Sequence, residues 1–432
     1  MTVVAAFLRG VQARFKARRP GGAGFLRPRF SQPDPCRQGR LDGLADLTWS
    51  RAHLSNPGFG ENMWQQSTIR ADRAQLRRAC ALLLVAALIA LSGCAARPGP
   101  ETLLPVADLA EQGSKITLLT ATNRALSSEN PPAYGSERST MSYEEFSLHV
   151  ALPAAGDLMR PDPVAQPDVK VAARLRFGRQ TFLEKLGSLH RQRGSTIMLF
   201  VHGYNNSYQE AVFRLAGMAA ETQIDVVPVV FSWPSAASFA GYVTDRDSSA
   251  YARDDLVRLL TDLAAASPDR QVLVVGHSMG GHLVMEALRE LRQTGRNDVI
   301  AKMEVGLASP DIDLDLFQKQ AGDVGRLTPP MTVLVAPDDR ALEAAARVAG
   351  GRIRLGAVDV SDPQVQAMAE RAGVRLIDIS ALPASGNANH DRFLALAALR
   401  MPGTQDNPLQ ELRHTGAYVL GSAGRILTYG TP

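Results

Sequence analysis

Apolar and polar positions follow two different periods along most of this chain. Short continuous apolar runs, rich in Val, Ile and Leu, occur at 196–201, 226–231, 271–275, 303–307, 331–336 and 374–379. Longer amphipathic stretches with the period of a helix lie at 177–192, 208–222, 250–265, 279–294, 340–349, 362–372 and 391–400. Strands alternating with helices in this way predict βαβ units and a mostly parallel central sheet with helices on both faces.

The chain before residue 172 follows a less regular pattern. Runs at 116–120 and 146–152 have the composition of strands. A stretch rich in Ser, Glu, Asn and Pro separates them at 125–143, and a second Pro- and Asp-rich stretch covers 153–172. Both stretches predict loops, so the region reads as a short β-containing extension in front of the α/β domain.

A second apolar segment lies near the start of the chain and has the features of a secretory signal. Arg73, Arg77 and Arg78 precede an apolar run at 79–91, which is too short to span a bilayer with ease. The run ends in Leu91-Ser92-Gly93-Cys94, which resembles the bacterial lipobox, where cleavage before the cysteine leaves a lipid on its sulfur. The alternative is an uncleaved membrane anchor.

This signal divides the chain. We expect a leader at 1–93, in which residues 1–62 are disordered or precede the true start at Met63, and 63–93 form the lipoprotein signal peptide. A lipidated tether at 94–112, an α/β domain at 113–402 and a tail at 403–432 follow. The predicted location is the bacterial cell envelope, lipid-anchored by Cys94, with Ala95 favouring the outer membrane facing the periplasm.

Charge and cysteine content exclude several function classes. Residues 1–93 hold 14 basic and 5 acidic residues, whereas 94–432 hold 33 and 38, so the basic character belongs to the leader. The body therefore has no basic excess for binding nucleic acid. All three cysteines lie at or before Cys94, which excludes disulfides and thiolate metal sites beyond it. The sequence predicts no cofactor and no metal.

The strongest chemical motif is Gly276-His277-Ser278-Met279-Gly280, between the apolar run at 271–275 and the helix predicted from Met279. A strand, a sharp turn and a helix around Gly-x-Ser-x-Gly are typical of a nucleophile elbow, which lifts the serine hydroxyl above the sheet edge. The turn is tight enough to bring Gly276 and Gly280 almost into contact with each other, so neither position has room for a side chain. Ser278 is therefore the predicted nucleophile.

An acyl-transferring serine needs two backbone N–H donors for the oxyanion. One is expected from Met279, which follows the nucleophile, and the second from the loop after the strand at 196–201. That loop reads His202-Gly203-Tyr204-Asn205-Asn206, so Tyr204 N–H is the predicted second donor. One asparagine is expected to cap the helix near Tyr208, and Asn205 is also a candidate substrate contact.

In the α/β-hydrolase fold, where such an elbow is found, the catalytic residues occur along the chain in the order serine, acid, histidine. His390 follows the last predicted strand by a polar loop and precedes a helix, which suits the catalytic base better than His414 in the tail. The acid is expected at the end of the run 331–336, where Asp338 and Asp339 both fit.

Asp311 is the rival acid, since it follows the run at 303–307. Asp311, Asp313 and Asp315 are spaced like the start of a calcium loop. Leu316 and Gly322 stand where such a loop needs glycine and glutamate, so calcium is not expected.

With these residues assigned, the sequence resembles the bacterial α/β-hydrolase family of unassigned function within the esterase/lipase superfamily, many of whose members are lipoproteins. The resemblance implies Asp339, rather than Asp338, as the acid, although Pro337-Asp338 departs from the usual residues before it. The matching segments are Thr120–Arg124, Phe200–Asn206, Phe231–Pro234, Tyr242–Leu260, Gly276–Gly281, Ser309–Asp313 and Asp339–Leu342.

Together these features predict a serine hydrolase of the α/β-hydrolase fold that cleaves a small-molecule or lipid carboxylic ester through an acyl-enzyme on Ser278. Trp233 and Tyr242 are candidates for lining the acyl pocket, although buried aromatic residues more often belong to a core. The alternatives are an acyltransferase or peptidase with the same triad, and a catalytically idle lipoprotein that binds an envelope partner. The sequence does not predict an oligomeric state.

Overall fold

A nine-stranded sheet organises the part of the chain that the computed structural model describes, namely residues 97–107, 109, 113–152, 167–193, 196–222, 226–268, 272–382, 384 and 388–395. Its order is β3-β2-β1-β5-β4-β6-β7-β8-β9, antiparallel between β1, β2 and β3 and parallel from β1 onward. The strands are β1 (Ser114–Leu126), β2 (Tyr134–Ala151), β3 (Asp168–Phe177), β4 (Thr196–Val201), β5 (Val226–Ser232), β6 (Val272–His277), β7 (Met303–Ala308), β8 (Thr332–Val335) and β9 (Arg375–Asp378).

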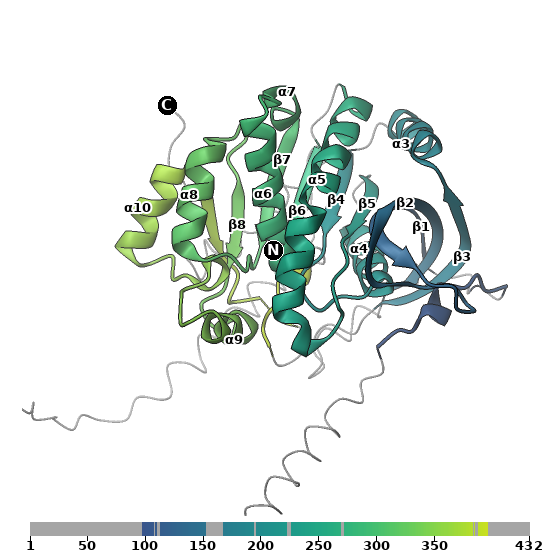
Figure 1. Ribbon diagram of the computed structural model, residues 1–432, viewed down its shortest axis with the longest axis horizontal. Coiled ribbons are helices and arrows are strands. Elements are labelled where there is room, and N and C mark those ends of the chain that lie inside the picture. Colours follow the sequence, from purple (N-terminus) through teal and green to yellow (C-terminus); the bar gives the residue numbers. More distant parts are fainter. Residues whose placement is uncertain are drawn as a thin grey trace, which may run out of the picture. The chain divides into compact units, whose positions relative to one another are not determined.

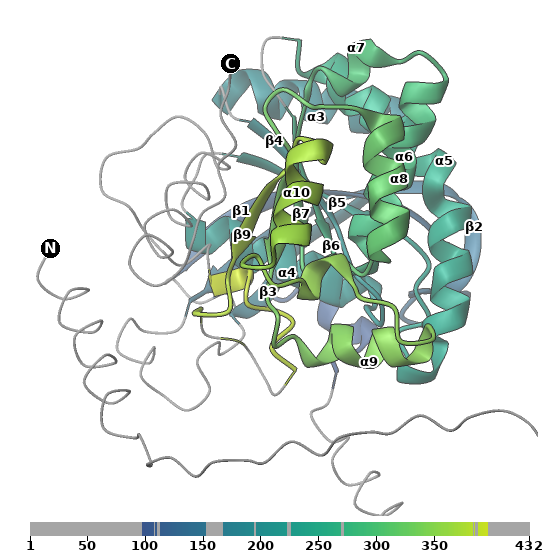
Figure 2. The same cartoon turned by 90° about the vertical axis from the view of Figure 1, so that its left-hand side faces the viewer.

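Helices cover both faces of this sheet (Figures 1 and 2), which confirms the predicted α/β-hydrolase fold. Successive strand residues point to opposite faces, so Leu199 and Val201 of β4 join one core while Met198 and Phe200 join the other. The first core also contains residues of α3 (Arg179–Arg193), α5 (Tyr242–Ala266), α6 (Met279–Gln293), α8 (Leu314–Val324) and α10 (Pro363–Ala372), and the second contains α4 (Tyr208–Thr222).

Strand β6, which ends directly before Ser278, lies inside the sheet between β4 and β7. All strands from β4 to β9 are parallel, so their carboxyl ends meet at one edge. Loops after β4, β6, β7, β8 and β9 are therefore brought together there, which is where ligands bind in open α/β sheets. Helix α9 (Arg340–Val348) follows β8 at this edge, and the short α7 (Asn297–Ile300) precedes β7.

Two predicted loops before residue 172 are wrong in part. Most of 125–143 is strand, because β1 continues to Leu126 and β2 starts at Tyr134. Likewise β3 begins at Asp168, inside the second predicted loop, whose residues 153–166 lie outside the described part. The start of β2 is mostly exposed and polar, so it lacks the apolar alternation that reveals a half-buried strand.

Two helical predictions also need correction. Helix α8 was missing from the prediction; Asp313, one of the aspartates with the spacing of a calcium loop, caps it by accepting a hydrogen bond from Leu316 N at 3.0 Å. Helix α5 starts at Tyr242 rather than at 250. Of the helix predicted at 391–400, residues 396–400 lie outside the described part.

The predicted tether is not a free linker where it is described. Leu103 in a short 3₁₀ turn (Pro100–Leu103) is buried, and Val106 N donates to Val171 O of β3 at 2.9 Å. The leader, Cys94 and the tail lie outside the described residues. Among the helices that the structure does describe, none combines the length and apolarity needed to cross a bilayer.

Candidate active site

Ser278 occupies the sharp turn between β6 and α6. Its backbone has φ 54° and ψ −121°, a strained conformation for a residue with a side chain, and Met279 begins the helix. Ser278 N donates to Ala308 O at the end of β7 at 2.9 Å, which ties the turn to the neighbouring strand. The helix N-terminus behind Ser278 favours negative charge developing at this position.

The surrounding glycines are required for steric reasons. A Cβ on Gly276 would lie 2.9 Å from Gly281 Cα, and one on Gly280 would lie 2.3 Å from Val201 O. A Cβ on Gly203, in the loop after β4, would lie 2.8 Å from the Ser278 Cβ. The elbow and this loop are therefore packed directly against each other.

His390 and Asp339 form the second part of the site. His390 Nδ1 lies 2.7 Å from Asp339 Oδ2, and the Asp339 carboxylate is fully buried. The other oxygen, Oδ1, accepts from Leu342 N at 3.0 Å, so Asp339 also caps α9 and is held from both sides. Burial alone would lower the pKa of His390, but the hydrogen bond and charge of Asp339, with Asp391 and Asp311 farther away, raise it overall.

The two rival acids are engaged elsewhere. Asp338 is half exposed and forms an ion pair with Arg392, which lowers the pKa of the Asp338 carboxyl. Asp311 is buried; it accepts from Tyr242 Oη at 2.7 Å and lies 3.2 Å from Arg354 Nε. Of the three aspartates that the sequence left open, Asp339 is thus the one that contacts His390.

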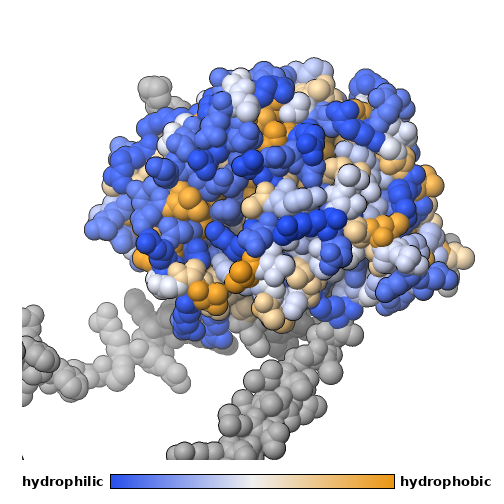
Figure 3. Space-filling model, viewed as in Figure 1, coloured by the Kyte–Doolittle hydropathy of each residue, from blue (hydrophilic) through white to orange (hydrophobic). Residues whose placement is uncertain are grey.

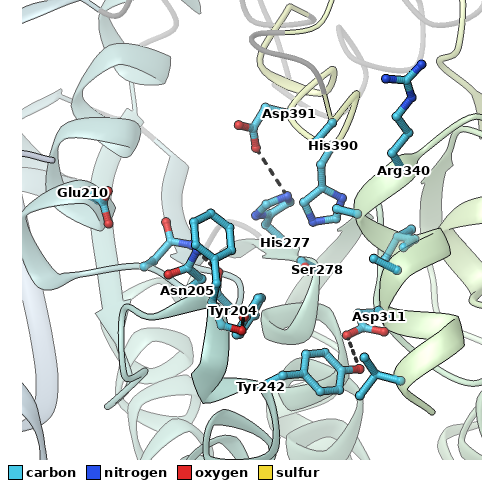
Figure 4. Close-up of a pocket in the computed structure, with 18 of the residues that line it drawn as sticks. Tyr204, Asn205, Glu210, Tyr242, His277, Ser278, Asp311, Arg340, His390 and Asp391 are labelled. Atoms are coloured by element: carbon cyan, nitrogen blue, oxygen red, sulfur yellow. Dashed lines mark hydrogen bonds and ion pairs between the residues drawn. The ribbon is translucent and has the colours of Figure 1, made fainter. Parts of the chain in front are cut away.

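Ser278 and His390 line the same cavity, with the imidazole beside the serine in Figure 4. Within the described residues the Ser278 hydroxyl has no hydrogen-bond partner, so no hydrogen bond joins it to His390 in this structure. Catalytic hydrogen bonds of this kind are often long in a free enzyme and tighten with substrate. The three predicted triad positions therefore lie at the same edge of the sheet, where Asp339 contacts His390 and His390 lines the cavity of Ser278.

The ring of His277, the neighbour of the nucleophile, packs against that of His390, with centroids 4.7 Å apart. Burial, and then the nearby His390, lower the pKa of His277 well below its usual value, so it stays neutral. Asp391, 3.8 Å from His277 Nε2, accepts from Arg214 of α4 at 2.8 Å. Sequence reasoning did not identify this Arg214–Asp391 pair, because nothing in the spacing links 214 to 391.

The Gly203–Tyr204 peptide has a fixed orientation. Its carbonyl oxygen lies 2.8 Å from His202 Nδ1, which must be the protonated nitrogen because a carbonyl only accepts. A trans peptide directs its N–H opposite to its C=O, so Tyr204 N–H points away from His202. Neither this N–H nor that of Met279 has a hydrogen-bond partner among the described residues. Both backbone donors predicted for the oxyanion are thus available.

Buried polar groups hold the rest of this loop in place. Trp233 Nε1 donates to His202 O at 2.7 Å, and Arg124 Nη2 donates to Asn206 O at 2.8 Å. Asp245 of α5 accepts from Asn205 N at 3.1 Å. Arg124 and Asp245 were not predicted as site residues; both lie in segments that carried the family resemblance, and that resemblance was the only available signal.

Two further predictions about this loop need correction. Helix α4 is capped by Ser207 and Glu210, through Glu210 N to Ser207 Oγ at 3.3 Å and Ser207 N to Glu210 Oε2 at 2.8 Å. This Ser-x-x-Glu box, rather than Asn205 or Asn206, begins the helix. Trp233 is fully buried, stacks on His202 and does not line the cavity, so it supports the loop instead of the substrate.

The cavity over Ser278 has a volume of about 660 Å³, a common size for a small-molecule site. One wall is apolar and comes mainly from α9: Ala341, Leu342, Ala344, Ala345 and Val348, with Phe239 and Tyr242 beside it. The remaining lining is largely polar: Arg97, Asn205, Glu210, Arg214, Asp311, Arg340 and Asp391. Asn205 and Tyr242 thus line the cavity as predicted, and the two walls differ in the groups they suit.

Residues 179–405 match a family described as alpha/beta hydrolase of unknown function (DUF900). The chain belongs to this family. A relative from Nostoc sp. (strain PCC 7120 / SAG 25.82 / UTEX 2576), the uncharacterized protein alr1448, is 35% identical over 24% of this chain and 33% of its own length. This chain thus spans about a third of that relative.

Two solved structures are similar at low identity. A protein from Agrobacterium vitis S4 described as a hydrolase is 13% identical with a TM-score of 0.27, over 72% of this chain and 98% of that one. A structure from a study of two fungal esterases of Rhizomucor miehei is 12% identical with a TM-score of 0.27, over 72% and 83%. At these scores neither structure informs the substrate of this family member.

Proposed function

We propose that this α/β hydrolase is a carboxylic-ester hydrolase that works through an acyl-enzyme on Ser278. The observation that carries the proposal is the contact of His390 with the buried Asp339 at 2.7 Å, in a site where His390 and the serine of the elbow line one cavity. Two available backbone N–H groups beside this serine add the second requirement for acyl transfer.

In the proposed reaction, Ser278 Oγ attacks the ester carbonyl carbon while its proton passes to His390 Nε2. Asp339 accepts from Nδ1–H, which fixes the tautomer and stabilises the imidazolium. The carbonyl oxygen becomes the oxyanion and accepts from Tyr204 N–H and Met279 N–H. The intermediate then collapses, the C–O bond breaks, and the alcohol leaves with the proton from His390.

Water completes the cycle. His390 takes a proton from a water molecule, the resulting hydroxide attacks the acyl carbon, and the second intermediate releases the acid and returns the proton to Ser278. The apolar wall made by α9 suits the acyl group, and the polar wall near Arg97 and Arg214 suits the alcohol side. Each backbone donor is worth about 3 kcal/mol of transition-state stabilisation.

A fluorophosphonate probe tests the nucleophile. We expect the full chain to be labelled, Ser278→Ala to lose labelling, and Ser309→Ala to keep it, since Ser309 is a buried serine at the end of the adjacent strand. An unlabelled wild-type chain would instead favour the idle binding protein. Adding alcohol and amine acceptors during turnover, and short peptides as substrates, separates the hydrolase from an acyltransferase or a peptidase.

We also propose that the protein is an envelope lipoprotein, with the acyl groups on Cys94. The support is the basic, apolar and small-residue order of 73–94. Growth with a labelled fatty acid followed by gel analysis tests it. Cys94→Ala is expected to abolish incorporation while Cys80→Ala keeps it, and fractionation of the two membranes tests the outer-membrane assignment.

A further inference from the structure

The N-terminal segment of the described chain lies at the mouth of the cavity. Arg97 lines the cavity and forms an ion pair with Glu210, with Nε 2.8 Å from Oε1. Its Nη1 donates to Asn205 Oδ1 at 3.0 Å, and the same guanidinium contacts Ala237 O. Arg97 therefore joins the loop after β4 to the segment before α5, on the polar side of the mouth.

Three apolar side chains at this mouth are exposed to an unusual degree. Phe239, Val243 and Val348 are 88%, 69% and 65% exposed, and we call them the apolar rim. Phe239 and Val348 line the cavity, and Val243 follows Tyr242, which lines it too. Phe239 and Val243 are four residues apart where a 3₁₀ turn (Phe239–Gly241) runs into α5, which places them on one side.

Figure 3 shows apolar side chains gathered around α9, the helix that carries Val348. Single exposed apolar residues are normal, but a group around a cavity mouth marks a surface that meets an apolar partner. Two of the three rim residues, Phe239 and Val348, line the cavity itself, where they join the apolar residues of α9. An acyl chain can thus follow the apolar side chains of α9 from such a partner into the cavity that holds Ser278.

We propose that the apolar rim docks on the lipid bilayer, so that the enzyme takes its ester substrate from the membrane and acts on lipid-type esters. This inference rests on the proposed hydrolase function and on the proposed lipid at Cys94, and it names the substrate class. The partner is a bilayer rather than a protein because of where the chain enters the site. Cys94, the proposed lipid attachment, precedes Arg97 by three residues, which span about 10 Å at most. An acyl group at that position holds the mouth against the membrane.

The first experiment measures hydrolysis by the full chain mixed with vesicles of phosphatidylethanolamine and phosphatidylglycerol. It compares a long-chain ester held in the vesicles with a short-chain, water-soluble ester of the same alcohol. Replacing the rim by Phe239→Ser, Val243→Ser and Val348→Ser together is expected to lower the long-to-short activity ratio by about tenfold or more.

The matched control replaces three apolar residues that do not line the cavity, Val106→Ser, Leu175→Ser and Tyr251→Ser, and is expected to change the ratio less than about twofold. An unchanged ratio in the rim variant, or an equal loss in the control, overturns the inference.

A second measurement needs no turnover and separates the two proposals. Phe239→Trp is mixed with vesicles whose acyl chains carry bromine, which quenches tryptophan fluorescence within the bilayer; Leu175→Trp is the control. Quenching of the first variant alone supports the docking surface even where ester hydrolysis fails. Absence of quenching overturns the docking surface while ester hydrolysis still stands. A rim that is shielded by a second copy of the chain, seen as a dimer, gives the same negative result.

Discussion

Replacing Asp339 by asparagine separates the catalytic role of this carboxylate from its structural role. Asp339 uses Oδ1 to cap α9 at Leu342 N and Oδ2 to accept from His390 Nδ1. Asparagine keeps one oxygen for the cap, since it is as good an N-cap residue as aspartate. Its NH₂ group then faces His390 and stabilises the tautomer whose Nε2 already carries a proton and cannot accept from Ser278.

The expected loss is about 10⁴-fold in kcat, or about 5 kcal/mol of transition-state stabilisation. The free energy of unfolding is expected to fall by only about 1.5–3 kcal/mol, the usual cost of losing one buried charge-assisted hydrogen bond. Asp338→Asn loses a half-exposed ion pair to Arg392 and serves as the matched control, with less than about threefold change in kcat.

The assay combines steady-state hydrolysis of a chromogenic short-chain ester with denaturant unfolding of each variant. Asp311→Asn completes the set, because Asp311 accepts a hydrogen bond from Tyr242 and forms an ion pair with Arg354 rather than contacting His390. The reasoning is refuted if Asp339→Asn keeps more than about a tenth of the wild-type kcat while one of the other two variants loses it.

Four other predictions concern the same site. Because His390 must be neutral to act, kcat/KM should rise as pH passes its pKa, which lies above 6.5; in Asp339→Asn, where burial remains and the raising charge is gone, a pH profile should show this limb shifted to lower pH. The contribution of the His390–Asp339 ion pair to the free energy of unfolding changes with pH in the opposite direction. It is fully present below pH 6.5 and is lost as the pH rises through the pKa of His390 in the folded protein, which unfolding at several pH values measures. Gly203→Ala places a Cβ 2.8 Å from the Ser278 Cβ and so displaces the nucleophile or the loop. We expect kcat for ester hydrolysis to fall about 100-fold, and an unchanged kcat would contradict the packing argument. Arg124→Lys keeps the charge but not the planar fork, so kcat should fall more than KM rises, and the free energy of unfolding should fall by about 3 kcal/mol; an effect on stability alone would make Arg124 merely structural.

The sequence predicted the parallel part of the fold well because its apolar runs are buried on both faces. Strand β4 and helix α4 have the bounds that the pattern indicated. The antiparallel part was missed where β2 carries polar residues on both sides. Its pairing with β1 is made by backbone groups over a long register, and backbone hydrogen bonds leave no mark in a residue pattern.

The site was predictable where the chemistry restricts the residue type and the chain order. Ser278 and His390 follow from the turn and the order, but the choice of Asp339 needed the family resemblance and then a distance. Arg214, Asp245 and Arg124 reach the site from α4, α5 and β1, far apart in sequence. Such long-range contacts depend on tertiary packing, which spacing along the chain does not encode.

Arg124 is a fully buried cation, which is unfavourable for stability, and its contacts indicate a role in holding the loop after β4. Burial lowers its pKa to about 10, and its described partners are carbonyl oxygens, the Ser232 hydroxyl and His202 rather than a carboxylate. These partners accept five hydrogen bonds from the guanidinium, and the charge of Asp245 partly offsets the effect of burial on its pKa, but no carboxylate pairs with it directly, so burying this cation still costs free energy.

The same charge adds to burial in lowering the pKa of His202 to about 3, which keeps that ring neutral. With Nε2 facing Arg124 and Ser232, which both donate, the single proton of the ring must sit on Nδ1 and be donated to Gly203 O. That bond sets the orientation of the Gly203–Tyr204 peptide and hence the direction of the Tyr204 N–H. The cost of burying Arg124 is therefore offset in function, since it fixes through one histidine tautomer the donor that the proposed oxyanion needs.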